Sequence, residues 1–404
     1  MSSPEWTVPL SDVTGDDELA GAVADAVRSG WWSAGPRVAE LEADFASLVE
    51  ARHSIAVSNG TAALHLALLA ADVGPGDEVI TPSLTFVAVA NTIRHVGATP
   101  VFCDVQGPGD LNLDPADLEA AITPRTKAMV VLHYGGFPCA IDSVLEIASS
   151  RGIVVVEDAA HAVGATVGGR ACGTLGSLGC FSFFSNKNLP IGEGGMVVTD
   201  DDDLARRVRL LRSHGMTTLT WDRHRGHASS YDVLLPGYNY RLDDLRAAMA
   251  LVQLRRLPVW NAARRRLADG YVRRLHDELG LTIAFAERDD RDTASHHLAV
   301  AVLPDGADRD AVRGALAAAR IQTSVHYPPI HGFAAYEAFR GRPLPRTDSL
   351  ADRLLTLPLY PDLSEGQLES VAQTLLGALA TGSRGSASPK PDEAPVQARS
   401  DPGA

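Results

Sequence analysis

Short apolar runs that alternate with helix-like stretches are the feature of this chain that most restricts its fold. They fill the first half, where segments with helical spacing such as 61–71 and 141–150 separate several of them. A strand that is apolar at consecutive positions is buried on both faces, and intervening helices allow parallel neighbours. We therefore predict an α/β fold with a largely parallel sheet, whose strands lie at residues 54–57, 78–81, 100–103, 128–132, 153–157, 180–184 and 196–199.

The pattern changes near Tyr240, after which the stretches with helical spacing of apolar residues become longer. Helices are predicted over 242–256 and then to 279, followed by a smaller α+β unit with a strand at 297–303 and helices at 309–319 and 367–379. We predict a large domain over residues 1–250, a small C-terminal domain over 251–380, and a tail over 381–404. The tail is rich in Ser, Pro, Gly and charge, so it is expected to be disordered.

Charge and cysteine content exclude several classes of function. The net charge of -14 argues against nucleic acid or an anionic membrane as a general partner. The 4 cysteines show neither CxxC spacing nor a zinc pattern, so no metal is predicted and a reducing compartment is expected. There is no secretion signal and no apolar run long enough to span a membrane, so a cytoplasmic protein is predicted.

Chemistry-bearing residues follow the predicted strands, at the edge where open parallel sheets bind ligands. Gly60 and Thr61 begin a helix after the first strand, and a helix N-terminus suits a phosphate, although such residues also serve simply as caps. Asp158 ends the fifth strand, and one helical turn would bring His161 to the same side. Each of these residues alone is common at such positions and does not indicate a function.

Lys187 follows the sixth strand, next to small polar residues and a glycine-rich turn. Lysines are usually solvated, but burial at a strand end would lower the pKa of this amine and make it a nucleophile for Schiff-base formation. An anion cradle, a carboxylate, a hydroxyl partner and a buried lysine are the set that pyridoxal phosphate needs. A Rossmann-type dehydrogenase does not fit, because no GxGxxG follows an early strand.

The ordered segments also resemble a known family, the DegT/DnrJ/EryC1/StrS sugar aminotransferases. They are SNGTAALHLAL, GDEVITPSLTFVAVANTI, VVVEDAAHAVGA, FSFFSNKNLPIGEGGMVVT, GYNYRLDDLRAAMALVQL, HYPPIH and LLTLPLYPDLS, within residues 9–379. The resemblance implies the aspartate aminotransferase type of fold (fold type I). This fold has a large domain with a mixed, mostly parallel seven-stranded sheet and a smaller C-terminal α+β domain.

The resemblance also assigns roles to residues. Lys187 would hold pyridoxal phosphate as a Schiff base and move a proton, and Asp158 would pair with the pyridine nitrogen. His161, where many members have Gln, would bind the ring hydroxyl, and Phe86 would stack on the ring. Members that lack the lysine act as dehydratases, so Lys187 favours transamination.

The phosphate would be held by Gly60, Thr61 and Ser182, together with Asn239 from a neighbouring subunit. The resemblance therefore implies a homodimer with sites shared between subunits. The expected amino donor is glutamate. The expected acceptor is a nucleotide-linked keto sugar, with dTDP-4-keto-6-deoxy-D-glucose as the favoured substrate of a 4-aminotransferase.

Candidates for binding the substrate, and above all its diphosphate, are Arg223, His224, Arg225, Arg241, His326 and Tyr327, although arginines of this kind also occur on solvated surfaces. The cofactor motifs do not report on the ketone, so a 3-keto sugar or a keto cyclitol remains an alternative. A non-catalytic regulatory member is a further alternative. A composition rich in Ala, Arg and Gly fits a high-GC source, and the resemblance implies that members from such sources often supply aminosugars for natural products such as antibiotics.

Overall fold

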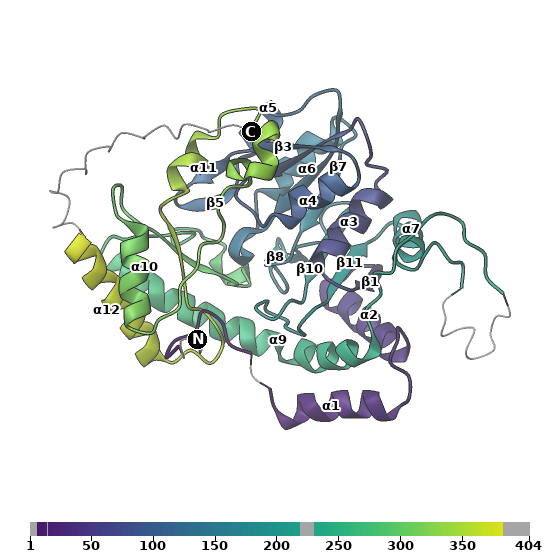
Figure 1. Cartoon of the computed structure of the whole chain (residues 1–404), viewed down its shortest axis with the longest axis horizontal. Helices are drawn as coiled ribbons and strands as arrows, with labels where there is room; N and C mark the ends of the chain where they lie inside the picture. The colour runs from purple at the N-terminus through teal and green to yellow at the C-terminus, as the bar shows by residue number, and fades with distance from the viewer. Residues whose placement is uncertain (1–5, 14, 219–229, 383–404) are drawn as a thin grey trace, which may run out of the picture.

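A seven-stranded sheet forms the centre of the protein in the computed structural model, which describes residues 6–13, 15–218 and 230–382 (Figure 1). Its strand order is β1-β11-β10-β7-β6-β2-β3. The strands are β1 His53–Val57, β2 Glu78–Pro82, β3 Thr99–Cys103, β6 Thr126–Leu132, β7 Val154–Asp158, β10 Leu178–Ser182 and β11 Gly195–Thr199. β11 is antiparallel to both neighbours and the other pairs are parallel. The prediction of a mixed, mostly parallel sheet is confirmed.

Two predicted strands of the sheet are displaced along the chain. The run predicted at 153–157 is β7 Val154–Asp158, so Asp158 is the last residue of the strand and pairs with Cys180 and Leu132. The run predicted at 180–184 is β10 Leu178–Ser182. Pairing with neighbouring strands decides where a strand ends, and that information is absent from the local apolar pattern.

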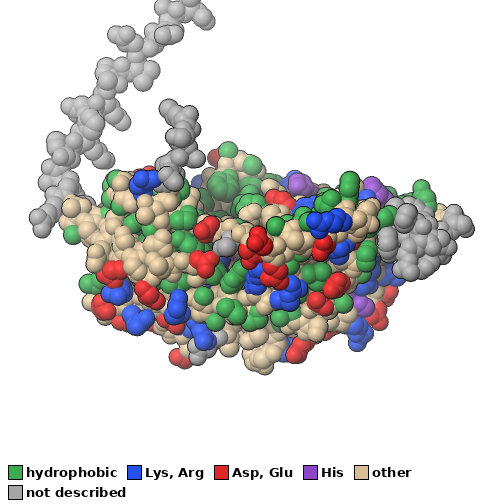
Figure 2. Space-filling model, turned by 90° about the horizontal axis from the view of Figure 1, so that it is seen from below, with side chains coloured by type: hydrophobic (Ala, Val, Ile, Leu, Met, Phe, Trp, Pro, Cys, Tyr) green, Lys and Arg blue, Asp and Glu red, His purple; other side chains and the backbone are tan. Residues whose placement is uncertain are grey.

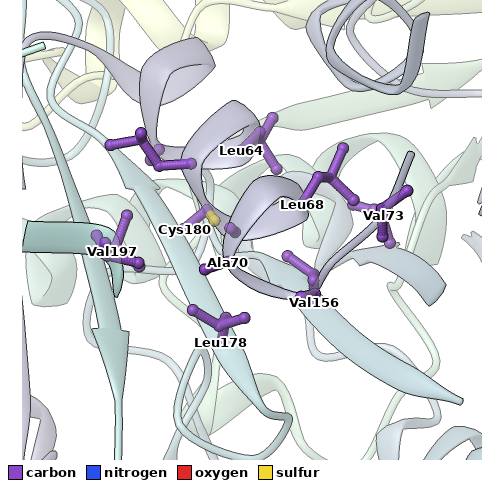
Figure 3. Close-up of a cluster of buried hydrophobic side chains, with 14 of the residues drawn as sticks. Leu64, Leu68, Ala70, Val73, Val156, Leu178, Cys180 and Val197 are labelled. Carbon is purple, nitrogen blue, oxygen red and sulfur yellow. The ribbon is translucent and has the colours of Figure 1, made fainter. Parts of the chain in front are cut away.

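Helices cover both faces of the sheet, as the apolar runs require. One face is covered by α3 Gly60–Ala70, α4 Ala88–His95 and α7 Asp202–Arg212. Figure 3 shows the centre of this layer, where Leu64 and Leu68 of α3 pack beside Val156, Leu178 and Val197 of the strands. The other face is covered by α2 Pro36–Val49, α5 Pro115–Ala120, α6 Ile141–Ser149 and α9 Asp244–Tyr271.

A smaller layer follows α9. It contains an antiparallel sheet of β12 Thr282–Ile283, β13 Ala299–Val302 and β14 Leu354–Leu357, covered by α10 Arg309–Ala318 and α12 Glu365–Gly382. α9 is continuous across the predicted boundary at residue 250 and contacts both layers (Figure 1). α12 reaches into the first residues of the predicted tail. The division into domains remains a prediction.

Further helices and short strands complete the described part of the fold. They are α1 Asp17–Arg28, which packs on α9, α11 Pro345–Leu350, and the short strands β4 Val105–Gly107, β5 Asp110–Leu113, β8 Thr166–Val167 and β9 Arg170–Ala171. On the face that Figure 2 shows, basic and acidic side chains of the described residues are interspersed. Within the described ranges, no helix is both long and apolar enough to cross a membrane.

Candidate active site

A cavity of about 540 Å³ opens where the carboxyl ends of β7 and β10 meet the N-terminus of α3. It brings together most of the residues that the sequence singles out, namely Gly60, Thr61, Phe86, Asp158, His161, Ser182, Lys187, His326 and Tyr327. Asn239 and Arg241 do not line it. Arg223, His224 and Arg225 lie outside the described residues.

The N-terminus of α3 forms one end of the cavity. The side chain of Asn59 caps the helix by accepting a hydrogen bond from the Ala62 backbone N–H at 2.8 Å. Gly60 permits close packing here, because a Cβ atom on it would lie 2.8 Å from Cβ of Ser182. Free N–H groups at a helix start, with a serine hydroxyl opposite, fit a phosphate group. The capping and phosphate-binding interpretations of this motif are thus compatible.

Lys187 lies in the turn after β10, where its backbone N–H donates to the Phe184 carbonyl at 2.8 Å. Burial lowers the pKa of its amine to about 8, against the opposing effect of the Asp158 carboxylate. Far more of the amine is therefore unprotonated near neutral pH than for an ordinary lysine, and the unprotonated amine is the nucleophilic form. The environment fits a lysine that condenses with an aldehyde.

Asp158 is buried at the end of β7, and its carboxylate accepts a hydrogen bond from the Ala160 N–H at 3.1 Å. Burial raises the pKa of this carboxyl group, and the Lys187 cation opposes that rise. A buried carboxylate is stabilised by a cationic partner, and a protonated pyridine nitrogen would provide one. The preceding Glu157 accepts four hydrogen bonds, from the His133 ring and three backbone N–H groups, and so anchors this strand end.

His161 lies on a turn after β7, where a helical turn was predicted. Its Nδ1 accepts a hydrogen bond from the Gly135 N–H at 3.3 Å, which leaves the proton on Nε2, 2.9 Å from the Tyr327 hydroxyl. Burial, together with the Lys187 cation, lowers its pKa well below 6.5, so the ring is neutral. A neutral Nε2–H group can donate a hydrogen bond to a ring hydroxyl, as the sequence predicts.

The rim and wall of the cavity are aromatic. Phe86 is 55% exposed, and its ring centroid lies 5.8 Å from that of Tyr327, which leaves a ring face free for stacking. Burial lowers the pKa of His326 to about 4, so this residue would meet a ligand through hydrogen bonds rather than charge. Its Nδ1 lies 3.0 Å from the Thr356 hydroxyl.

Sequence reasoning missed several lining residues, among them His65, His95, Glu193 and Tyr240. The sequence could have predicted that His65 lines the cavity, because it stands four residues after Thr61 and therefore on the same helix face. Its Nδ1 lies 3.2 Å from the Tyr240 hydroxyl. His95 is the last residue of α4, and Glu193 and Tyr240 lie within the quoted segments, but no pattern in the sequence marks their side chains as facing the cavity.

Asn239 is exposed, whereas its neighbours Tyr238 and Tyr240 stack on each other with ring centroids 5.0 Å apart and pack against the cluster that contains α3. Alternation along an extended segment explains why Asn239 points the other way. Arg241 is half-buried, and burial next to the Arg212 cation lowers its pKa. Neither Asn239 nor Arg241 contributes to the cavity of its own chain.

Comparison with known proteins agrees with this geometry. The model of the DegT/DnrJ/EryC1/StrS aminotransferase family matches residues 13–376. The spore coat polysaccharide biosynthesis protein SpsC of Bacillus subtilis (strain 168) is 42% identical over 378 residues, which cover 92% of this chain and 95% of SpsC.

Two solved structures extend the comparison. Helicobacter pylori PseC, an aminotransferase involved in the biosynthesis of pseudoaminic acid, superposes with a TM-score of 0.86 at 27% identity, over 93% of this chain and 99% of PseC. The PLP form of the putative sugar aminotransferase Spr1654 of Streptococcus pneumoniae gives a TM-score of 0.83 at 28% identity. The superposition covers 93% of this chain and 98% of Spr1654.

Proposed function

The chain belongs to the DegT/DnrJ/EryC1/StrS aminotransferase family, and from this premise we propose that it transfers an amino group from glutamate to a nucleotide-linked keto sugar. Membership makes it a pyridoxal-phosphate-dependent sugar aminotransferase with a fold of type I, as the sequence predicts. The favoured acceptor is dTDP-4-keto-6-deoxy-D-glucose, aminated at carbon four. The observation that carries the proposal is the meeting of Lys187, Asp158 and the start of α3 in one cavity.

The residues of this chain divide the chemistry among them. Bound pyridoxal phosphate supplies an aldehyde that condenses with amines and a protonated ring that accepts electron density. Gly60, Thr61 and Ser182 would hold the phosphate, and Asp158 would keep the proton on the ring nitrogen. The Lys187 amine, with its pKa lowered to about 8, would serve as the nucleophile toward the aldehyde and as the group that moves the proton.

Other residues orient the reactants. The Nε2–H of His161, which lies 2.9 Å from the Tyr327 hydroxyl, would donate a hydrogen bond to the ring hydroxyl. Phe86 covers one face of the ring and limits the access of water there. His326 stays neutral and meets the substrate through hydrogen bonds.

The proposal includes a homodimer. Asn239 is exposed and lies outside its own cavity, which supports its assignment to the phosphate of a second copy. A mixture of Lys187→Ala and Asn239→Ala chains tests this directly, because a hybrid dimer contains one site with neither substitution. Recovery of activity on mixing supports shared sites, and activity no higher than that of the separate variants excludes them.

Absorbance spectroscopy tests the function. The visible band of the bound cofactor should disappear when glutamate is added and return when dTDP-4-keto-6-deoxyglucose follows. Return of the band with a 3-keto sugar or a keto cyclitol instead would move the assignment to those substrates. A band that glutamate never changes, when other amino donors also fail, would favour the regulatory alternative. Lys187→Ala is the control, because it should lack the band from the start.

The wider assignments remain predictions. Supply of aminosugars for natural products such as antibiotics, and a cytoplasmic location, rest on composition and resemblance alone. Similarity to SpsC, a spore coat polysaccharide biosynthesis protein, supports an aminosugar product without deciding its destination.

A further inference from the structure

A second cavity, of about 20 Å³, lies beside the active-site cavity and shares Asn186 and His326 with it. Its other polar lining residues are Ser11, His297 and Thr356, and leucines form the rest. Asn186 is the neighbour of Lys187 in the chain. The small cavity is therefore next to the reactive lysine, although Lys187 itself does not line it.

The protonation pattern of His297 follows from its partners. The Asn188 amide nitrogen donates hydrogen bonds to Oδ1 of Asn261 and to the Ser295 carbonyl, both at 2.8 Å. The Asn188 oxygen must then be the acceptor that faces Nδ1 of His297 at 3.0 Å. Nδ1 of His297 therefore carries the proton, and Nε2 presents a bare lone pair.

That lone pair is buried without a hydrogen-bond partner among the described residues, and so is the Oδ1 atom of Asn186. His297 is only 4% exposed, and burial lowers its pKa well below 6.5, so Nε2 does not take up a proton near neutral pH. The two residues that carry these acceptors both line one small cavity. Buried acceptors without donors are rare because they lose their bonds to water. A ligand for this cavity must donate two hydrogen bonds.

We propose that the cavity binds one ordered water molecule, which donates one hydrogen to His297 Nε2 and the other to Asn186 Oδ1. A buried water needs roughly 10–15 Å³ of such space and two to four polar partners, so the cavity holds one molecule. The hydroxyl group of Ser11 also lines the cavity and can donate to the water oxygen.

The water has a structural consequence for the reactive lysine. It links Asn186, on one side of Lys187, to His297, which Asn188 holds from the other side. The His297 ring also packs on His161, with ring centroids 4.5 Å apart. The turn that carries Lys187 is thereby held by hydrogen bonds on both sides, and the His161 ring packs against the same histidine. This role is independent of which sugar the enzyme uses.

Crystal structures of the cofactor-loaded protein and of two variants test the proposal. His297→Phe removes the acceptor and keeps a ring against His161. His296→Phe is the matched control, because His296 is equally buried but outside the cavity, and its Nε2 lies 2.8 Å from the Arg291 carbonyl oxygen. We expect a water peak within hydrogen-bond distance of both acceptors in the wild type and the control, and its loss in His297→Phe.

Two results would overturn the proposal. One is wild-type density without the water. The other is an Asn186 side chain turned so that its nitrogen donates directly to His297. Nitrogen-15 NMR of labelled histidines in the wild type gives an independent reading that does not depend on any variant folding. Protonation of His297 at Nδ1 supports the site, and protonation at Nε2 rules it out.

Discussion

Replacement of Glu157 by Gln gives the sharpest prediction about what holds the active-site strand in place. Glu157 is fully buried and immediately precedes Asp158. Its Oε1 accepts hydrogen bonds from the N–H groups of Leu175 at 2.7 Å and Gly176 at 2.6 Å. Its Oε2 faces Nε2 of His133 and the Gly173 N–H, both at 2.8 Å.

The expected loss of stability follows from the number of hydrogen-bond donors that lose their acceptor. In Glu157→Gln one oxygen becomes an NH₂ group, so two of the four buried donors lose their acceptor whichever way the amide turns. Each such donor costs about 1–3 kcal/mol, so two of them together cost about 2–6 kcal/mol. His133 cannot compensate by moving its proton, because its Nδ1 accepts a hydrogen bond from the Cys139 N–H. We expect a loss of about 3 kcal/mol in the free energy of unfolding.

Urea denaturation of the cofactor-free protein measures this loss. Glu119→Gln is the matched control, because Glu119 forms an ion pair with Arg151 at 2.7 Å on the exposed surface. Such surface pairs contribute about 0–1 kcal/mol, so the control should unfold almost as the wild type does. A Glu157→Gln variant as stable as the control would refute the reasoning.

Three further predictions concern the site. Lys187→Ala should lose both the visible cofactor band and turnover, and an unchanged spectrum would show that the lysine is misassigned. The pKa of Lys187, lowered to about 8 by burial, predicts that cofactor uptake by the cofactor-free protein accelerates as pH rises through about 8, where the amine loses its proton. A stopped-flow profile with its midpoint near the ordinary lysine value of 10.5 would contradict this. Gly60→Ala should weaken cofactor binding, because the added Cβ meets Ser182 at 2.8 Å and overpacking typically costs about 1–3 kcal/mol. Fluorescence titration measures this effect, and Gly21→Ala, with nothing within 4 Å of the added Cβ, is its control.

The sequence was informative where the signal is local. Apolar runs located all seven strands of the sheet to within two residues, because burial on both faces requires a continuous apolar stretch. The residues at the strand ends, Asp158 and Lys187, could be singled out because parallel strands present their carboxyl ends at one edge. The resemblance to a family then named the cofactor and the roles that go with it.

Only the tertiary structure decided which distant residues meet. The bond between His161 and Tyr327 joins positions 166 residues apart, and His297 contacts Asn188 across 109 residues. No periodicity in the sequence relates such positions, because their distance depends on how the two layers pack. The antiparallel orientation of β11 is likewise a property of strand pairing.

The exposure of Asn239 also depends partly on the local sequence and partly on tertiary packing. The sequence places it between two aromatic residues in an extended segment, and alternation puts it on the opposite side from both. Which of the two sides faces the protein depends on the packing of Tyr238 and Tyr240 against the α3 layer. Local patterns thus determined which residues are buried and which could carry chemistry. Packing between segments far apart in the chain decided where each side chain points, because that packing maximises burial over the whole fold rather than within one segment.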